Sequence, residues 1–129
     1  MGTMAGTPLA PRVLIVDDQA LFRGMARRLL EARGYLVAGE ADSAAAAMDA
    51  AERLAPDAVL LDVCLGRANG FDVARALTQA CPGVAVVLVS CDDYRHCATL
   101  LQECGAQGFV LKSELARADL AAYWPAPSA

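Results

Sequence analysis

The sequence lacks several features that would place it in other classes of protein. No apolar run approaches the roughly 18 residues that a membrane-spanning helix needs, so we predict no membrane span. The first residues, Met1 to Pro11, have neither the basic region nor the apolar core of a secretion signal. We therefore expect a cytoplasmic protein that makes no contact with membranes.

Metal-binding motifs of the zinc type are also absent. The chain has one histidine, and none of its cysteines belongs to a CxxC pair, so no zinc site is predicted. Because disulfides persist in oxidising compartments, we interpret the cysteines as reduced thiols, most of them buried as small hydrophobic side chains. They are Cys64, Cys81, Cys91, Cys97 and Cys104.

Length, composition and charge indicate one acidic globular domain. The chain has 129 residues, 57% of them hydrophobic and 20% charged, which is enough to form a core without cross-links. Its formal net charge is −4, and phosphate contacts need basic side chains. We therefore predict that this domain does not bind nucleic acid directly.

Stretches with the apolar pattern of a β-strand alternate along the chain with stretches that have the apolar pattern of a helix. Short apolar runs predict five strands, at 12–16, 35–41, 57–61, 84–89 and 109–111. Amphipathic or alanine-rich stretches predict five helices, the first between Asp18 and Gly34, then 44–54, 71–80, one from Asp92 or Asp93 to Cys104, and 115–123. Such alternation predicts an α/β fold, a doubly wound five-stranded parallel sheet, because each parallel crossover needs a helix.

Boundaries and caps follow from the same pattern. The domain is expected to cover 12–123, with a disordered tail at 1–11 and a short tail at 124–129. Asp18 is predicted to cap the first helix, and Asp42 or Ser43 the second. A loop is expected at 62–70.

Polar side chains follow four of the five predicted strands. Carboxylates end two of them, a hydroxyl ends the third and a lysine ends the last, and these residues are Asp17, Asp18, Asp62, Ser90 and Lys112. The carboxyl ends of parallel strands meet at one edge of a sheet, where open α/β folds place their sites. Each residue alone is more often a turn former or a surface charge, but the set predicts a common site.

The chemistry of this set favours phosphoryl transfer. Two carboxylates about 4 Å apart repel by about 4 kcal/mol at an effective dielectric constant near 20. Lys112 offsets part of this repulsion, and a hard cation such as Mg²⁺, held by carboxylates and a phosphate oxygen, offsets more. Asp62 is then the nucleophile, and Ser90 and Lys112 bind the incoming group.

These motifs resemble the receiver domain of bacterial two-component response regulators. The resemblance rests on 13–18 (VLIVDD), 59–65 (VLLDVCL) with Gly70 beyond it, 88–90 (LVS) and 105–112 (GAQGFVLK). It implies a (βα)5 flavodoxin-like fold and a signalling phosphoacceptor. Such a domain assists its own phosphorylation and dephosphorylation and is not an enzyme with a separate substrate.

The resemblance also implies a role for each site residue. Asp62 accepts phosphate from a sensor histidine kinase, and Ser90 and Lys112 contact the phosphoryl group. Mg²⁺ is held by Asp17, Asp18, Asp62 and the backbone carbonyl of Cys64. Phe109 is the switch aromatic, whose ring turns inward when Ser90 moves toward the phosphate.

The resemblance indicates partners as well. Residues 17–25 are similar to receivers joined to helix-turn-helix transcription regulators, so the chain is either a stand-alone receiver, the receiver part of a longer regulator, or a descendant that lost its output domain. Output is expected through helix 4, strand 5 and helix 5, where Tyr94, Arg95, His96 and Gln102 are candidates. A homodimer that depends on phosphorylation is a further option.

Two departures from the family pattern lie beside the acceptor. The family usually has proline where this chain has Gly66, so a more flexible loop is expected. Cys91 follows Ser90 where the family prefers a smaller residue, and it is expected to narrow access to the phosphate.

Two other functions were compared with this one. A phosphatase of the haloacid-dehalogenase type also uses an aspartate, but as an Asp-x-Asp pair after its first strand. Here that strand ends in Asp17-Asp18-Gln19, which does not fit. An interaction module that is never phosphorylated would not need the complete set of acids, hydroxyl and lysine.

Overall fold

A computed structural model describes residues 10–125, and its centre is a five-stranded parallel sheet. The strands are β1 (Arg12–Val16), β2 (Leu36–Ala41), β3 (Ala58–Asp62), β6 (Ala85–Ser90) and β7 (Gly108–Leu111), in the spatial order β2-β1-β3-β6-β7. The five predicted strands are confirmed to within one residue at each end. β1 and β3 are inner strands, and apart from Arg12 at the start of β1 and Asp62 at the end of β3 their residues are apolar and buried, as expected for strands covered on both faces.

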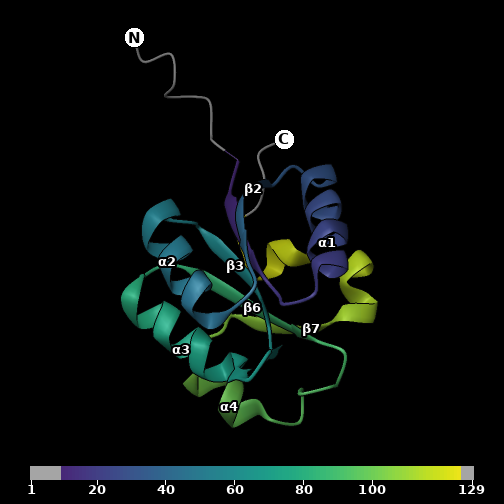
Figure 1. The fold of residues 1–129 in the computed structure, drawn as a ribbon. Helices are drawn as coiled ribbons and strands as arrows, with labels where there is room; N and C mark the ends of the chain where they lie inside the picture. Colours follow the sequence, from purple (N-terminus) through teal and green to yellow (C-terminus); the bar gives the residue numbers. More distant parts are fainter. Residues whose placement is uncertain (1–9, 126–129) are drawn as a thin grey trace.

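Helices cover both faces of the sheet (Figure 1). One face packs against α2 (Ala44–Leu54), α3 (Gly70–Ala80) and α4 (Ala98–Glu103), and the other packs against α1 (Ala20–Ala32). Alternate residues of each strand enter the two cores; in β1, for example, Leu14 and Val16 face α2 and α3, whereas Val13 and Ile15 face α1. The predicted doubly wound fold is therefore confirmed.

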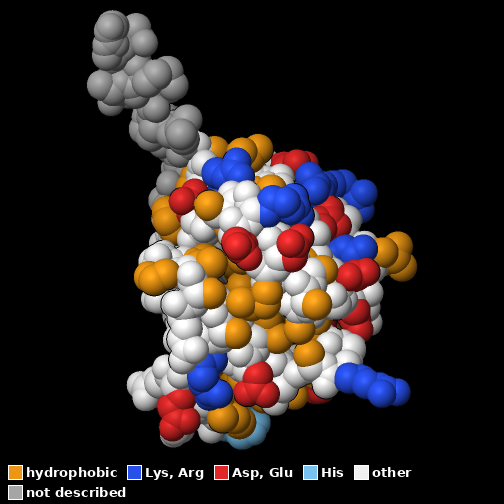
Figure 2. All heavy atoms as spheres, turned by 60° about the vertical axis from the view of Figure 1, so that its left-hand side comes forward, with side chains coloured by type: hydrophobic (Ala, Val, Ile, Leu, Met, Phe, Trp, Pro, Cys, Tyr) orange, Lys and Arg blue, Asp and Glu red, His pale blue; other side chains and the backbone are white. Residues whose placement is uncertain are grey.

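The second and third helices agree with their sequence patterns. Ser43 caps α2 by accepting a hydrogen bond from the backbone N–H of Ala46, and Asn69 caps α3 in the same way through Phe71. Phe71, Ala74 and Leu77 face inward, as predicted. Because α2 is rich in alanine, the outer surface around α2 and α3 shows small apolar side chains (Figure 2).

The first helix differs from the prediction at its start. Asp18 does not cap it; the cap position is Gln19, and it makes no side-chain hydrogen bond to the helix. Of the apolar residues in α1, Ala26 and Leu30 are buried, whereas Leu21 is 91% exposed. Asp18 is instead held across the site by a different segment, as described below.

The last two helices are the largest corrections. The helix expected from Asp92 or Asp93 begins only at Ala98, so neither aspartate caps it, and none of its residues is buried. The expected helix 115–123 is replaced by two short 3₁₀ helices, Lys112–Arg117 and Leu120–Ala122. The structure thus has four α-helices in its described part, and helix 5 of the prediction does not form.

The C-terminal segment nevertheless closes the core. Leu115, Leu120 and Trp124 are buried on the α1 face of the sheet, and the Trp124 ring meets Tyr35 edge to face at 5.5 Å. Trp124, assigned from the sequence to a tail, is only 3% exposed, so the packed structure extends beyond residue 123. Pro11, placed by the sequence in the disordered tail 1–11, is buried, and its carbonyl accepts a hydrogen bond from Leu36 N at 2.9 Å, so that boundary is also wrong. Residues 1–9 and 126–129 of the two predicted tails lie outside the described residues.

The predicted loop 62–70 contains a small hairpin. β4 (Cys64–Leu65) and β5 (Ala68–Asn69) pair antiparallel, with Gly66 and Arg67 as the turn. Gly66 has φ +59°, a left-handed conformation that glycine adopts without strain. This segment therefore has a defined conformation beside the end of β3.

Two further features of the described residues bear on the sequence analysis. No helix within residues 10–125 is long and apolar enough to cross a bilayer. All five cysteines are free thiols, as predicted, but Cys104 alone is buried, and Cys64 and Cys91 are exposed. The prediction that most of them are buried is therefore wrong.

Ala55, just after α2, carries backbone strain. It is the one described non-glycine residue with positive φ (φ 47°, ψ 60°), at a position where glycine is usual. We expect Ala55→Gly to raise the free energy of unfolding by up to about 1 kcal/mol, because it removes this strain. Ala45→Gly, at an exposed helical position of α2, should lower it, and urea denaturation of both variants measures the difference.

Candidate functional site

The carboxyl edge of the sheet brings the five predicted residues together. Asp17 and Asp18 follow β1, Asp62 ends β3, Ser90 ends β6 and Lys112 follows β7. β1, β3, β6 and β7 are consecutive neighbours in the sheet, so their ends lie side by side. A cleft of about 250 Å³ opens at this edge, and Asp18, Asp62, Ser90 and Lys112 line it.

Three carboxylates form the centre of the cleft. Asp17, Asp18 and Asp62 each have a carboxylate oxygen within 4.8 Å of those of the other two. Asp17 and Asp62 are buried, whereas Asp18 is exposed. Oxygen atoms at this spacing are the ligand set that a hard divalent cation uses.

Lys112 is the counter-charge of this cluster. Its Nζ lies 2.7 Å from Oδ2 of Asp17 and 3.4 Å from Oδ2 of Asp62. The lysine side chain is only 11% exposed, so these ion pairs are partly shielded from water. Lys112 is also the only lysine of the chain, in which every other basic side chain except His96 is arginine.

The surroundings shift the pKa values of two of these groups. Burial and the nearby Asp17 carboxylate raise the pKa of Asp62, and Lys112 counteracts this only in part. Burial alone would lower the pKa of Lys112, but its contacts with Asp17 and Asp62 outweigh that effect and raise it. The Asp62 carboxylate is therefore less well stabilised as an anion than an exposed aspartate is.

Backbone N–H groups hold each carboxylate in place. All three hydrogen bonds come from loops beyond the strand ends: Gln19 N to Asp17 Oδ1 (2.8 Å), Cys64 N to Asp62 Oδ1 (3.2 Å) and Gly66 N to Asp18 Oδ2 (3.1 Å). The first two are local turns, whereas the third joins segments 48 residues apart.

Two residues of α1 support the site and were not predicted from the sequence. The ring of Phe22 lies 4.3 Å from the Lys112 ammonium, a cation–π contact that restrains the lysine. Arg23 donates to the backbone carbonyl of Asp17 at 2.7 Å and pairs with Glu40 of β2 at 2.9 Å. Neither contact has a sequence motif, because each depends on how α1 docks on the sheet.

Ser90 and Phe109 lie on neighbouring strands next to the cleft. The Ser90 hydroxyl oxygen accepts a hydrogen bond from Asp92 N at 3.1 Å, which leaves its proton free to donate elsewhere. Phe109 is buried, and its ring meets that of Tyr94 edge to face at 6.0 Å. Tyr94 in turn meets Phe71 of α3 at 5.5 Å, so Tyr94, one of the candidates for the output surface, connects β7 with α3.

The residues of the cleft fit a divalent cation. With all three carboxylates ionised, one ammonium leaves an excess of negative charge at the cluster. Oδ2 of the fully buried Asp17 has an ion pair with Lys112, but no donor among the described residues points at it with hydrogen-bond geometry. Because Asp17 and Asp62 share the single ammonium of Lys112, a divalent cation would compensate the remaining charge of these buried carboxylates.

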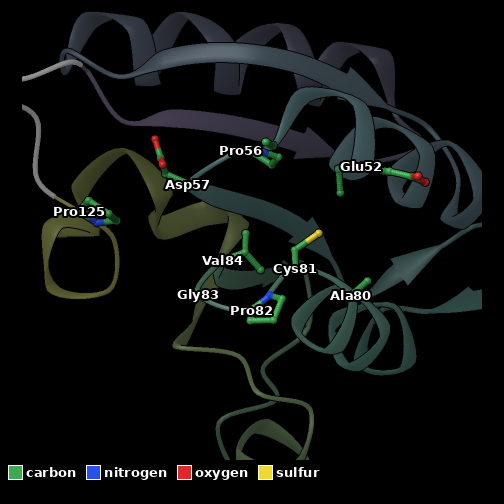
Figure 3. A pocket seen from close by; sticks show the side chains of 11 residues that line it. Glu52, Pro56, Asp57, Ala80, Cys81, Pro82, Gly83, Val84 and Pro125 are labelled. Carbon is green, nitrogen blue, oxygen red and sulfur yellow. The ribbon is translucent and has the colours of Figure 1, made fainter.

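A larger hollow lies at the opposite edge of the sheet (Figure 3). It measures about 490 Å³ and its wall includes Pro56, Cys81, Pro82 and Pro125. Asp57, one of its few charged side chains, is already bound to the backbone N–H of Arg12. The cleft that contains carboxylates, a hydroxyl and a lysine is therefore the smaller one, at the carboxyl edge of the sheet.

The fold and this cleft together define a class: flavodoxin-like α/β domains with an acidic site at the carboxyl ends of the strands. Residues 13–123 match the profile of the response regulator receiver domain. The chain belongs to the response regulator receiver domain family. This confirms the resemblance inferred from the motifs.

Individual relatives agree with this assignment. The chain is 37% identical over 102 residues to the response regulator GacA of Pseudomonas viridiflava, covering 78% of this chain and 48% of that protein. It is 31% identical over 104 residues to the chemotaxis protein CheY of Thermotoga maritima, covering 81% and 87%. The chain thus spans about half the length of GacA but most of CheY.

A solved structure gives the same result. The signal receiver domain of the NarL response regulator from Mycobacterium tuberculosis superposes with a TM-score of 0.77 at 34% identity, covering 85% of this chain and 90% of that one. The transcriptional regulatory protein DegU of Brevibacillus brevis is 30% identical over 102 residues, covering 78% of this chain and 43% of that protein, which agrees with the predicted likeness to receivers of transcription regulators.

Proposed function

We propose that this chain is a cytoplasmic phosphoacceptor in two-component signalling, with Asp62 as the residue that a sensor histidine kinase phosphorylates. The observation that carries this proposal is the cluster of Asp17, Asp18 and Asp62 around Lys112 at the carboxyl edge of the sheet. The arrangement has a nucleophile, a counter-charge and a free hydroxyl, which are the groups that phosphoryl transfer needs.

In the transfer, an oxygen of Asp62 attacks the phosphorus of a phosphohistidine. The new oxygen–phosphorus bond forms as the phosphorus–nitrogen bond breaks, and the histidine nitrogen leaves with the electron pair. Lys112 and the hydroxyl of Ser90 bind the phosphoryl oxygens and stabilise their charge. Bound Mg²⁺ would neutralise further negative charge, and Asp17, Asp18, Asp62 and the Cys64 carbonyl are the residues that would hold it.

The kinase must approach past the start of α1. Leu21 is 91% exposed and Met25, one turn further, is 38% exposed, and both follow Gln19, which lines the cleft. An exposed apolar pair beside the reacting group suits contact with a partner protein. We assign the kinase contact to this end of α1.

Output is proposed to pass through the surface made by α4, β7 and the 3₁₀ segment that replaces helix 5. α4 buries none of its residues, and so its position costs little to change. When Ser90 moves toward a phosphoryl group, the Phe109 and Tyr94 rings are placed to transmit the change. The output partner is another protein or domain. Phosphorylation would reach it by shifting the equilibrium between two existing arrangements of this surface, or by homodimer formation. This domain itself binds no nucleic acid.

The alternative function is a receiver-like interaction module that is never phosphorylated. Incubation with acetyl phosphate and Mg²⁺ separates the two functions, because the module would gain no phosphoryl group. If this chain is the receiver part of a longer DNA-binding regulator, the chemistry at Asp62 is the same.

Asp18→Asn is expected to weaken Mg²⁺ binding while leaving the metal-free fold equally or more stable. The substitution removes one ligand charge and also relieves repulsion with the other two carboxylates. Calorimetric titration with Mg²⁺ and thermal unfolding without metal measure the two effects. Marked destabilisation of the metal-free protein would instead show that Asp18 is mainly structural.

A further inference from the structure

We propose that Gly66 is a positioning residue for the metal ligand Asp18, through a hydrogen bond from its backbone N–H. This inference rests on the proposed function, since it concerns how the same site binds Mg²⁺. The contact is Gly66 N to Asp18 Oδ2, at 3.1 Å.

Asp18 needs such a restraint more than the other two carboxylates do. Asp17 and Asp62 are buried and enclosed by the sheet, whereas Asp18 is exposed. Within residues 10–125, the Gly66 N–H makes the one hydrogen bond to the Asp18 side chain. Without it, the carboxylate would sample several rotamers, and metal binding would have to restrict them.

The β4–β5 hairpin directs this N–H toward the cleft. Gly66 occupies the turn at φ +59°, a conformation that most other residues avoid. Proline, the residue that receivers usually have here, has no N–H and fixes φ near −65°. This chain therefore has a donor beside the metal ligands that the usual residue cannot supply.

The hairpin also links Asp18 to the acceptor. Cys64, at the start of the hairpin, donates its N–H to Asp62, and Gly66, at the turn, donates to Asp18. One short segment thus fixes two carboxylates that come from different strands. Groups that orient metal ligands in this way typically change metal affinity by about 10- to 100-fold.

The test compares substitutions at position 66 by calorimetric titration of the whole protein with Mg²⁺. Gly66→Pro, which installs the residue that receivers usually have here, removes the N–H and should weaken binding by up to about tenfold. Gly66→Asn keeps the N–H and tolerates positive φ, so its affinity should remain close to that of the unsubstituted protein. Space around Gly66 is open, with no atom within 4 Å of an added Cβ, so a loss of affinity would come from the missing N–H or from the change in φ and not from a clash of the Cβ.

Two additional measurements keep the inference falsifiable. Gly66→Val retains the N–H but disfavours positive φ, so it should also weaken binding even if Gly66→Pro fails to fold. In an Asp18→Ala background, which removes both side-chain oxygens, Gly66→Pro should have no further effect on Mg²⁺ affinity, because the acceptor of the Gly66 N–H is gone. Full affinity in Gly66→Pro, or equal loss in Gly66→Asn, would overturn the inference.

The outcome is distinct from that of the phosphorylation test. If the protein binds Mg²⁺ with the expected dependence on position 66 but gains no phosphoryl group, the positioning role stands and the proposed function fails. If the protein is phosphorylated but Gly66→Pro binds Mg²⁺ normally, the proposed function stands and the positioning role of Gly66 fails.

Discussion

Incubation with Mg²⁺ and acetyl phosphate should add one phosphoryl group to the protein, and Asp62→Asn should abolish the addition. Asp62 lies in the cleft beside Lys112 and the other two carboxylates, so it is the carboxylate that a phosphodonor can reach with its charge compensated. Intact-mass measurement detects the adduct directly. Omitting Mg²⁺ should reduce the yield strongly, because the excess negative charge of the cluster then repels the donor.

A matched substitution separates this effect from a general loss of charge. Asp49 is exposed on α2 and takes part in a surface ion pair with Arg53, so Asp49→Asn should be phosphorylated normally. Equal labelling of Asp62→Asn and the unsubstituted protein would refute the acceptor assignment. Rapid hydrolysis would conceal an adduct, and binding of beryllofluoride, which mimics the phosphoryl group without being hydrolysed, controls for it.

Lys112→Met should destabilise the protein by roughly 3 kcal/mol at neutral pH and also prevent phosphorylation. The ammonium is 2.7 Å from a carboxylate with no exposure and 3.4 Å from a second one that is 6% exposed. Removing one partner of a buried ion pair leaves uncompensated charge, which typically costs about 3–5 kcal/mol. Urea denaturation measures the loss, and Arg117→Met, at an exposed basic residue of the adjacent 3₁₀ helix, should have little effect.

The pH dependence of this loss has a definite sign. The folded-state pKa of Asp62 is already raised by burial and by Asp17, and it should rise further without Lys112. A raised carboxyl pKa lowers stability above that pKa, so Lys112→Met should regain stability as the pH falls toward the unfolded-state value near 4. Adding Asp62→Asn should reduce the loss and its pH dependence, and adding Asp17→Asn as well should remove most of the loss, because Asp17 is the closer partner of the lysine. A loss that is unchanged in the variant lacking both carboxylates would show that packing of the lysine, rather than its charge, is responsible.

Strand ends were the most predictable part of the site. Asp17, Asp62, Ser90 and Lys112 follow apolar runs, and the geometry of a parallel sheet brings the ends of such runs to one edge. The proximity of these four side chains can therefore be predicted from the positions of the strands in the sequence. Contacts such as those of Phe22 with Lys112 and of Gly66 with Asp18 depend on docking of separate elements, and no local pattern encodes them.

The missing last helix has a similar explanation. Residues 115–123 have helix-forming composition, but Leu115, Leu120 and Trp124 are all buried against the same face of the sheet. In one continuous α-helix, Leu120 and Trp124, which come five and nine positions after Leu115, would point away from the side of the helix that carries Leu115. Burying all three side chains requires a break, and a stretch this short has little helical stability of its own to resist it.

The single lysine allows the cleft to be observed selectively. Lysine labelled with an isotope and supplied during expression enters this protein only at position 112 and leaves its side chain unmodified. The labelled Nζ lies within the ion-pair distances of Asp17 and Asp62 that define the cleft. Its resonance would then report metal or phosphoryl occupancy without assignment of the rest of the spectrum.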